Sequence, residues 1–128
     1  MKDFDGWIMQ KKILNERATR PPFVSEGDIW WIGVGENIGT EMCGKSARFS
    51  RPAIIYKKLA RGFYLVIPTT TKQKTGTWYV KIRQQNVDMS VCLHQLRTID
   101  YRRLYKKLGS LDDADHQKVR NGFMALYK

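Results

Sequence analysis

An arginine and a run of three threonines stand at the ends of two apolar segments that follow one another in the sequence. Arg51 directly precedes the segment 52–58 (PAIIYKK), and threonines 69–71 follow the segment 62–68 (GFYLVIP). A guanidinium offers five donors in a fixed fork, and a threonine hydroxyl can donate to the same acceptor. If the two segments are neighbouring strands, these groups could bind a phosphate whose oxygens gain charge in a transition state. From composition alone, a surface salt bridge explains Arg51 equally well.

The histidines and cysteines do not form a second candidate site. General acid–base catalysis needs two groups in one place, but His94 falls within a predicted strand and His116 on the exposed side of the predicted last helix. Cys43 and Cys92 lie far apart in the sequence, and we interpret them as two independent reduced thiols rather than a disulfide. These four residues match no spacing of metal ligands, so we expect neither a metal nor another cofactor.

The charge of the chain is its strongest compositional signal. Lys and Arg number 23 and Asp and Glu number 12, which gives a net charge of +11 on 128 residues. A field of this sign favours polyanionic partners, either nucleic acid or a strongly acidic protein, although solubility alone or a membrane-surface role would also explain it. We favour nucleic-acid contact, because several basic residues lie beside aromatic residues and turns: Lys57, Lys58, Arg61, Lys72, Lys74, Lys81 and Arg83.

The length predicts one domain, and the composition is that of a soluble globular protein. No apolar stretch is long enough to span a bilayer, so we expect no membrane partner. The first residues (MKDFDGWIMQKK) contain acids and no apolar core region, unlike a secretory signal. We therefore expect a cytoplasmic protein.

Hydrophobic periodicity divides the chain into a helical start, a strand-rich middle and a helical end. Residues 3–18 predict an amphipathic helix that ends before the stiff Arg-Pro-Pro connector at 20–22. Strands are predicted at 28–34, 52–58, 62–68, 77–83 and 91–99, with a long exposed loop at 35–50 and a turn at 84–90. Asp100 can cap a helix at 101–108 that ends at Gly109, and Asp112 can cap the last helix.

The segment TWYVKIR alternates between two faces. Its apolar face is led by Trp78, while Tyr79 and Lys81 lie on a basic and aromatic face that is either solvated or a binding surface. We assign Trp30 and Trp78 to the core, whereas Trp31 and Tyr79 suit either core packing or stacking on bases. About five strands with helices at both ends predict a mainly β, α+β fold, a small antiparallel barrel.

Four short motifs occur in a fixed order along the chain. They are GDIWW, RPAII, IPTTT and QLRTIDYRRL followed by KKLG. In this order they resemble the MazF/PemK family of toxins from type II toxin–antitoxin systems. The resemblance covers residues 25–128, which we expect to form the toxin domain, and leaves residues 1–24 as an N-terminal helical arm with a Pro-rich connector.

The resemblance implies a barrel of the CcdB/MazF type, similar to a Src-homology-3 barrel. It also implies a homodimer with an RNA-binding groove near the dimer interface and an acidic antitoxin as partner. The implied activity is metal-independent, sequence-specific cleavage of single-stranded RNA by attack of the ribose 2′-hydroxyl on the adjacent phosphate. DNA lacks that hydroxyl and would be spared.

The resemblance also assigns roles to individual residues. It places the catalytic arginine at Arg51 and the catalytic hydroxyl at Thr69, with Thr70 as the alternative, while Arg97 is expected to be structural or interfacial. Loop 41–51 is longer than the usual family loop, so Arg48 could reach the space assigned to Arg51. The residues expected to bind RNA are Glu41, Lys45, Arg48, Thr70, Lys72, Lys74, Tyr79 and Lys81.

Two other functions stay open on the sequence. A CcdB-like toxin that binds a DNA topoisomerase shares the fold and performs no chemistry. A nucleic-acid-binding barrel without cleavage would bind DNA and RNA alike in a salt-sensitive manner. An RP/TTT pair that converges beside a basic surface favours the cleaving toxin over both.

Overall fold

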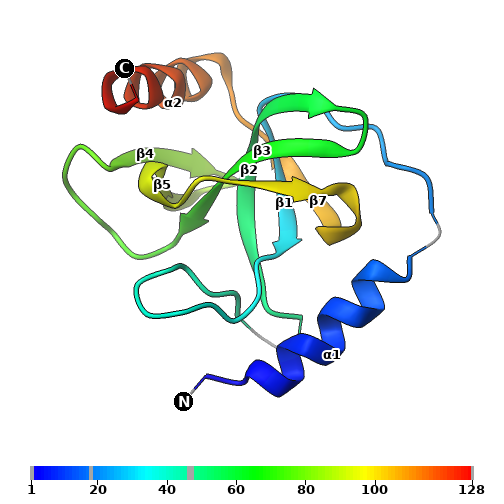
Figure 1. Ribbon diagram of the computed structural model, residues 1–128. Coiled ribbons are helices and arrows are strands. Elements are labelled where there is room, and N and C mark those ends of the chain that lie inside the picture. The colour runs from blue at the N-terminus through cyan, green and yellow to red at the C-terminus, as the bar shows by residue number, and fades with distance from the viewer. Residues whose placement is uncertain (1, 18, 46–47, 128) are drawn as a thin grey trace.

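The computed structural model describes residues 2–17, 19–45 and 48–127 of the 128-residue chain. In this part of the chain, seven strands form one antiparallel sheet whose neighbouring strands follow the order β4-β5-β3-β2-β1-β7, with β6 paired to β3 (Figure 1). The strands are β1 Asp28–Gly33, β2 Ser50–Ala60, β3 Phe63–Thr70, β4 Tyr79–Gln84, β5 Val87–Cys92, β6 Arg97–Asp100 and β7 Leu104–Ser110.

The two ends of the sheet meet through side chains from the β4–β5 turn. Gln85 Nε2 donates a hydrogen bond to the carbonyl of Leu108 in β7 over 3.2 Å. A Cβ at Gly109 would lie 1.9 Å from Nε2 of Gln84, the last residue of β4, so this side chain lies directly against the backbone of β7. The sheet is therefore curled into a small barrel, and the predicted mainly β, α+β fold is confirmed.

Alternation along the strands divides the core into two clusters. Ala53 and Ile55 of β2 point into a first cluster, which also contains Trp30, Ile32 and Val66, and all of them are buried. Ile54, the residue between them, points into the second cluster, whose buried members are Ile29, Ile54, Ile67, Ile82, Met89, Val91, Leu93 and Val119. Each face of β2 and β3 thus packs against a different set of residues.

The two helices lie on opposite sides of the sheet (Figure 1). Helix α1, Phe4–Asn15, is capped by Asp3, whose Oδ1 accepts from the backbone N–H of Gly6 over 2.8 Å. Helix α2, Asp113–Leu126, is capped by Asp112 as predicted and buries Val119 against the second cluster. None of the described helices is long and apolar enough to cross a membrane.

The predicted helix at 101–108 is wrong. Asp100 does cap the backbone N–H of Arg102, but the cap starts only one turn of 3₁₀ helix, Tyr101–Arg103. The chain then continues as β7, which pairs with β1. The segment LYKKLGS has the composition of a helix end, yet the free edge of β1 offers it a ladder of backbone hydrogen bonds, and this non-local pairing overrides local propensity.

The region 84–99 also differs from its prediction. The turn is confined to Gln85 and Asn86, both with positive φ (49° and 64°), and residues 87–92 form β5 rather than loop. The single strand expected at 91–99 is interrupted by a 3₁₀ turn, Leu93–Gln95, so that His94 is not within a strand. The division into β5 and β6 adds one strand to the predicted five, and β7 adds the other, so the described chain has seven strands.

Candidate active site

The register of β2 and β3 decides which polar groups meet at their ends. Ala53 pairs with Pro68, and continuing this antiparallel register by two residues sets Arg51 opposite Thr70. Both side chains fall on the face of the first core cluster, because Ala53 and Val66 point into it. The register therefore places Thr70, and not Thr69, on the same face as Arg51.

Thr69 points to the opposite face and is engaged in the fold. Its hydroxyl donates to the carbonyl of Pro52 over 2.8 Å, and only 1% of its surface is exposed. The hydroxyl of Thr70 instead accepts from the backbone N–H of Lys72 over 3.2 Å. Among the described residues nothing accepts the hydroxyl proton of Thr70, which leaves it available to a ligand oxygen.

The Arg51 guanidinium is half-buried and held from the β1–β2 loop. Its Nε donates to the carbonyl of Cys43. Burial lowers the pKa of Arg51, and this is opposed by the nearby thiols of Cys92 and Cys43. An arginine nevertheless stays charged at neutral pH, so the site presents a fixed, partly desolvated positive charge.

The β3–β4 loop closes over the same face. Lys74 donates its backbone N–H to the hydroxyl of Ser90 over 3.2 Å, and Ser90 is the β5 residue paired with Thr70. Burial raises the pKa of Cys92 to about 11, and the positive charges of Arg51 and Lys74 oppose this rise. Arg51, Thr70 and Lys74 thus converge near the β5 residues Ser90 and Cys92, and we call this group the β2–β3 site.

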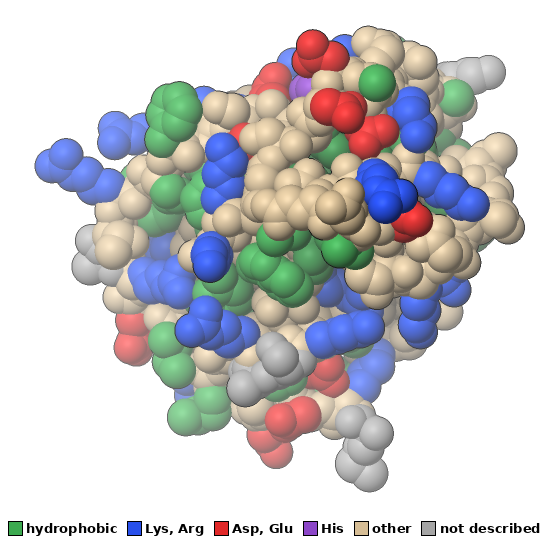
Figure 2. Space-filling model, turned by 180° about the vertical axis from the view of Figure 1, so that it is seen from behind, with side chains coloured by type: hydrophobic (Ala, Val, Ile, Leu, Met, Phe, Trp, Pro, Cys, Tyr) green, Lys and Arg blue, Asp and Glu red, His purple; other side chains and the backbone are tan. Residues whose placement is uncertain are grey.

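A cavity of about 680 Å³ opens beside this strand end. Arg51, Thr69 and Thr70 line it together with Lys45 and Arg48 from the long loop. The rest of its lining is largely apolar and includes Trp31, Pro52, Val87, Met89, Tyr105 and Leu108. Figure 2 shows the back face of the molecule, where hydrophobic side chains lie exposed among many Lys and Arg side chains.

The other residues expected to bind RNA lie outside this cavity. Glu41 lines a second cavity of about 380 Å³ together with His94 and Arg97. Lys72 and Lys81 are exposed, on the β3–β4 loop and on β4. The structure therefore brings Lys45 and Arg48 to the cavity that Arg51 lines, whereas Glu41, Lys72, Lys74, Tyr79 and Lys81 do not line it.

An aromatic stack beside the second cavity was missed by the sequence analysis. Trp78, assigned to the core from its alternation, is 53% exposed and stacks on His94 with ring centroids 4.8 Å apart. Tyr79 meets the same imidazole edge-on at 5.3 Å. Burial lowers the pKa of His94, and its Nδ1 is buried without a hydrogen-bond partner among the described residues. His94 lies on a 3₁₀ turn, whereas the sequence analysis placed it within a strand.

Helix α1 packs on the loop that borders the site. Trp7 is buried against Phe49 with ring centroids 5.7 Å apart, and its indole lies where a Cβ of Gly35 would be. The backbone N–H of Asp3 donates to Glu36 over 2.8 Å, at the start of the same loop. The helix therefore fixes both ends of the β1–β2 loop.

A second connection runs from α1 to the lining of the large cavity. Gln10 Nε2 donates to the hydroxyl of Tyr105 over 2.7 Å, and that hydroxyl donates to the carbonyl of Arg48 over 3.0 Å. The guanidinium of Arg48 also lies over the Tyr105 ring, 5.3 Å from its centroid. No sequence signal links residue 10 to residue 105, so this support could not be predicted.

Arg97 holds the start of the β1–β2 loop. Its Nη1 donates to the carbonyl of Val34 over 3.1 Å, and burial lowers the pKa of its guanidinium while Glu41 opposes that shift.

Within the described ranges, no group of three His, Cys, Asp or Glu side chains is arranged to hold a metal ion.

A comparison against protein families identifies the family of the chain. The family model for the PemK-like, MazF-like toxin of type II toxin–antitoxin systems matches residues 25–127. The chain belongs to this family. Helix α1 and the connector precede the matched range, and a search of curated proteins gives no match.

Solved structures of similar fold come from toxin–antitoxin systems. A crystal structure of MazF from Deinococcus radiodurans has a TM-score of 0.67 at 22% identity, covering 82% of this chain and 97% of that one. A MazE–MazF structure from the same organism gives 0.61 at 19% identity, covering 82% and 96%. An endoribonuclease in complex with its cognate antitoxin, from a mycobacterial species, gives 0.64 at 16% identity, covering 80% and 93%.

Proposed function

We propose that this toxin is a metal-independent endoribonuclease that cleaves single-stranded RNA at short sequence motifs. The observation that carries the proposal is the placement of Arg51 and Thr70 on one face at the paired ends of β2 and β3. A rigid pair of donors of this kind matches the oxygens of a phosphate in a transition state. The unit that performs the chemistry is residues 25–128.

The reaction needs no activated water, because the nucleophile belongs to the substrate. The ribose 2′-oxygen attacks the adjacent phosphorus and forms a new P–O bond, while the bond from phosphorus to the 5′-oxygen breaks. The proton lost from the 2′-hydroxyl is balanced by the proton gained by the leaving 5′-oxygen. The products are a 2′,3′-cyclic phosphate and a 5′-hydroxyl, and DNA cannot react in this way.

Arg51 and one threonine stabilise the charge that builds on the phosphate. Arg51 is too basic to remove a proton at neutral pH, so its role is to donate to the non-bridging oxygens. The sequence resemblance placed the second donor at Thr69, but its hydroxyl already donates to Pro52. We therefore assign the second donor to Thr70, the alternative at the sequence level.

The surroundings of the site suit an RNA strand. Lys45 and Arg48 supply positive charge within the large cavity, and the net charge of +11 attracts phosphates from a distance. We propose that the RNA continues past the remaining basic and aromatic residues, Lys72, Lys74, Tyr79 and Lys81. Glu41 would add a polar contact. Stacking on Tyr79 would be insensitive to sequence, whereas Glu41 can accept from the edge of a base.

We further propose that the protein works as a homodimer in the cytoplasm and is neutralised by an acidic antitoxin. The excess of Lys and Arg complements an acidic protein as well as RNA. Membership of a toxin–antitoxin family supports such a partner.

The test is to incubate the purified protein with a long single-stranded RNA in EDTA and map the ends of the products. We expect discrete cuts with cyclic-phosphate ends, abolished in Arg51→Ala and retained in Arg120→Ala, a control at an exposed position of α2. Intact RNA with the parent protein would contradict the proposal and favour a protein-binding toxin, and binding without cuts would favour a plain nucleic-acid-binding barrel.

A further inference from the structure

A basic and aromatic surface lies at the far end of the β2–β3 hairpin from the β2–β3 site. We call it the hairpin surface and define it as Arg20, Pro21, Pro22, Phe23, Lys58 and Arg61. Most of these residues line a cavity of about 480 Å³ between the connector and the hairpin. The phenyl ring of Phe23 is 89% exposed, which is an unusual state for so large an apolar group.

The connector that carries Phe23 is fixed on both sides. Before it, the hydroxyl of Tyr101 donates to the carbonyl of Thr19 over 2.5 Å. After it, Val24 is buried in the first core cluster with 2% exposed. Two consecutive prolines restrict the backbone between these anchors. The exposed ring is therefore held in place rather than carried on a loose segment.

The prolines also pack on the turn of the hairpin. Gly62 has φ +76°, and a Cβ there would lie 3.2 Å from the ring of Pro21 and 2.9 Å from Tyr101. Glycine at this position lets the connector approach the hairpin closely. The hairpin surface is thus one surface built from two segments that are distant in sequence.

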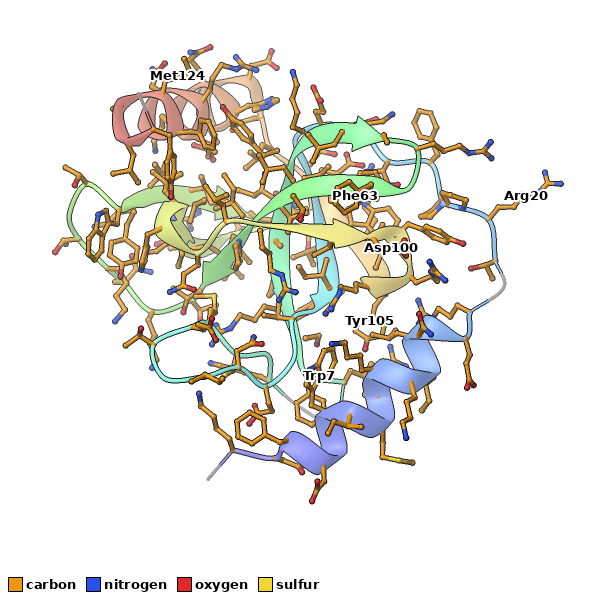
Figure 3. All side chains as sticks on the ribbon, in the orientation of Figure 1. Trp7, Arg20, Phe63, Asp100, Tyr105 and Met124 are labelled. Atoms are coloured by element: carbon orange, nitrogen blue, oxygen red, sulfur yellow. The ribbon has the colours of Figure 1, made fainter. Side chains whose placement is uncertain are left out.

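Positive charge surrounds the ring. The Lys58 ammonium lies 6.0 Å from the ring centroid of Phe23. Arg20 and Arg61 are exposed, and neither pairs with a carboxylate among the described residues. Figure 3 shows Arg20 projecting away from the ribbon on the side of the β2–β3 hairpin. The acidic neighbour Glu26 accepts from the backbone N–H of Lys58. The three cations Arg20, Lys58 and Arg61 outnumber this one carboxylate, so the surface keeps a positive charge.

From these contacts we infer that the hairpin surface is a second binding site for the RNA, separate from the β2–β3 site. One base stacks on Phe23, while Lys58, Arg20 and Arg61 bind the flanking phosphates. The inference rests on the proposed RNA-cleaving function. Residues 20–23 precede the range matched by the family model, whereas Lys58 and Arg61 lie within it.

The geometry sets the length of RNA that can reach both sites. Ten residues of strand separate Arg51 from Arg61, which at about 3.3 Å per residue is roughly 30 Å. At about 3.4 Å per stacked nucleotide, about nine nucleotides bridge this distance. An RNA of about six nucleotides around the cut therefore engages the β2–β3 site alone, while one of about 25 engages both.

The experiment compares kcat/KM on these two RNAs for Phe23→Ala and Arg61→Gln. On the long RNA we expect Phe23→Ala to lower kcat/KM about tenfold with kcat unchanged, and to leave the short RNA unaffected. Arg61→Gln should also reduce the slope of log kcat/KM against log salt by about 0.7. The matched controls are Met124→Ala, an apolar residue 61% exposed on α2, and Lys12→Gln, an exposed cation on α1.

Equal losses on short and long RNA, or no loss on either, would overturn the inference. A change in self-association or antitoxin binding of Phe23→Ala, with long-RNA cleavage unchanged, would instead make the surface a protein interface. If the parent protein cleaves neither RNA, the proposed function fails. Fluorescence anisotropy with the same two RNAs then still tests the hairpin surface. The inference requires that the parent protein binds the long RNA more tightly than the short one, and that Phe23→Ala removes this difference.

Discussion

Replacing Thr69 and Thr70 separately by valine distinguishes a structural hydroxyl from a catalytic one. Valine keeps nearly the same volume and removes only the hydroxyl. In Thr70→Val the phosphate loses a donor on the face of Arg51, which should reduce kcat by 10² to 10³-fold, or about 2.7–4 kcal/mol. Stability should fall by less than about 1 kcal/mol, because the N–H of Lys72 can bond to water at the loop.

Thr69→Val should show the opposite pattern. The variant leaves the carbonyl of Pro52 without its donor at a position that is 1% exposed. The loss of a buried hydrogen bond should lower the free energy of unfolding by about 1–3 kcal/mol. Cleavage under single turnover should stay within a few fold of the parent, because this hydroxyl faces away from Arg51.

The assay pairs single-turnover cleavage of one RNA with urea denaturation of the same preparations. The reasoning is refuted if Thr69→Val loses the rate and Thr70→Val cleaves like the parent. In that case the register does not decide the role of the hydroxyl, and the assignment from the sequence resemblance is the right one.

Three further predictions concern the support of the site. Trp7→Ala should weaken the docking of α1 by about 3 kcal/mol and speed amide exchange in the loop 34–45, whereas the exposed control Met9→Ala should change neither. Burial lowers the pKa of His94 in the folded protein below 6.5, so its contribution to stability is complete above pH 6.5 and is lost as pH falls through the folded pKa. Below pH 6.5 the urea midpoint of His94→Gln should therefore depend less on pH than the midpoint of the parent protein. An equal dependence in the two proteins would contradict this. Iodoacetamide should modify the partly exposed Cys43 before Cys92, whose thiol is buried with a pKa of about 11, and peptide mapping that finds the reverse order would show that β5 opens readily.

The fold could be predicted as far as local patterns determine it. The continuous apolar runs of β2 and β3 and the Asp112 cap of α2 are local signals, and the structure contains these elements. A helix was predicted at 101–108, where β7 begins at Leu104, because the strand character of β7 depends on pairing with β1, more than seventy residues earlier. Propensity scales contain no term for such a partner.

The site shows the same division between local and non-local information. An arginine before a proline at a strand start could be found from the sequence, and so could the threonine run. Which threonine shares a face with Arg51 depends on the register of two strands, which the sequence does not specify. The contacts of Trp7 with the β1–β2 loop and of Trp78 with His94 depend on tertiary packing alone.

The most direct test of the account is cleavage of an RNA that carries one 2′-deoxynucleotide on the 5′ side of a mapped cut. If the substrate's own 2′-hydroxyl is the nucleophile, cleavage in EDTA stops at this position and continues at unmodified sites in the same molecule. Continued cleavage at the deoxy position, or products with a 5′-phosphate, would contradict the proposed mechanism and show that water attacks instead.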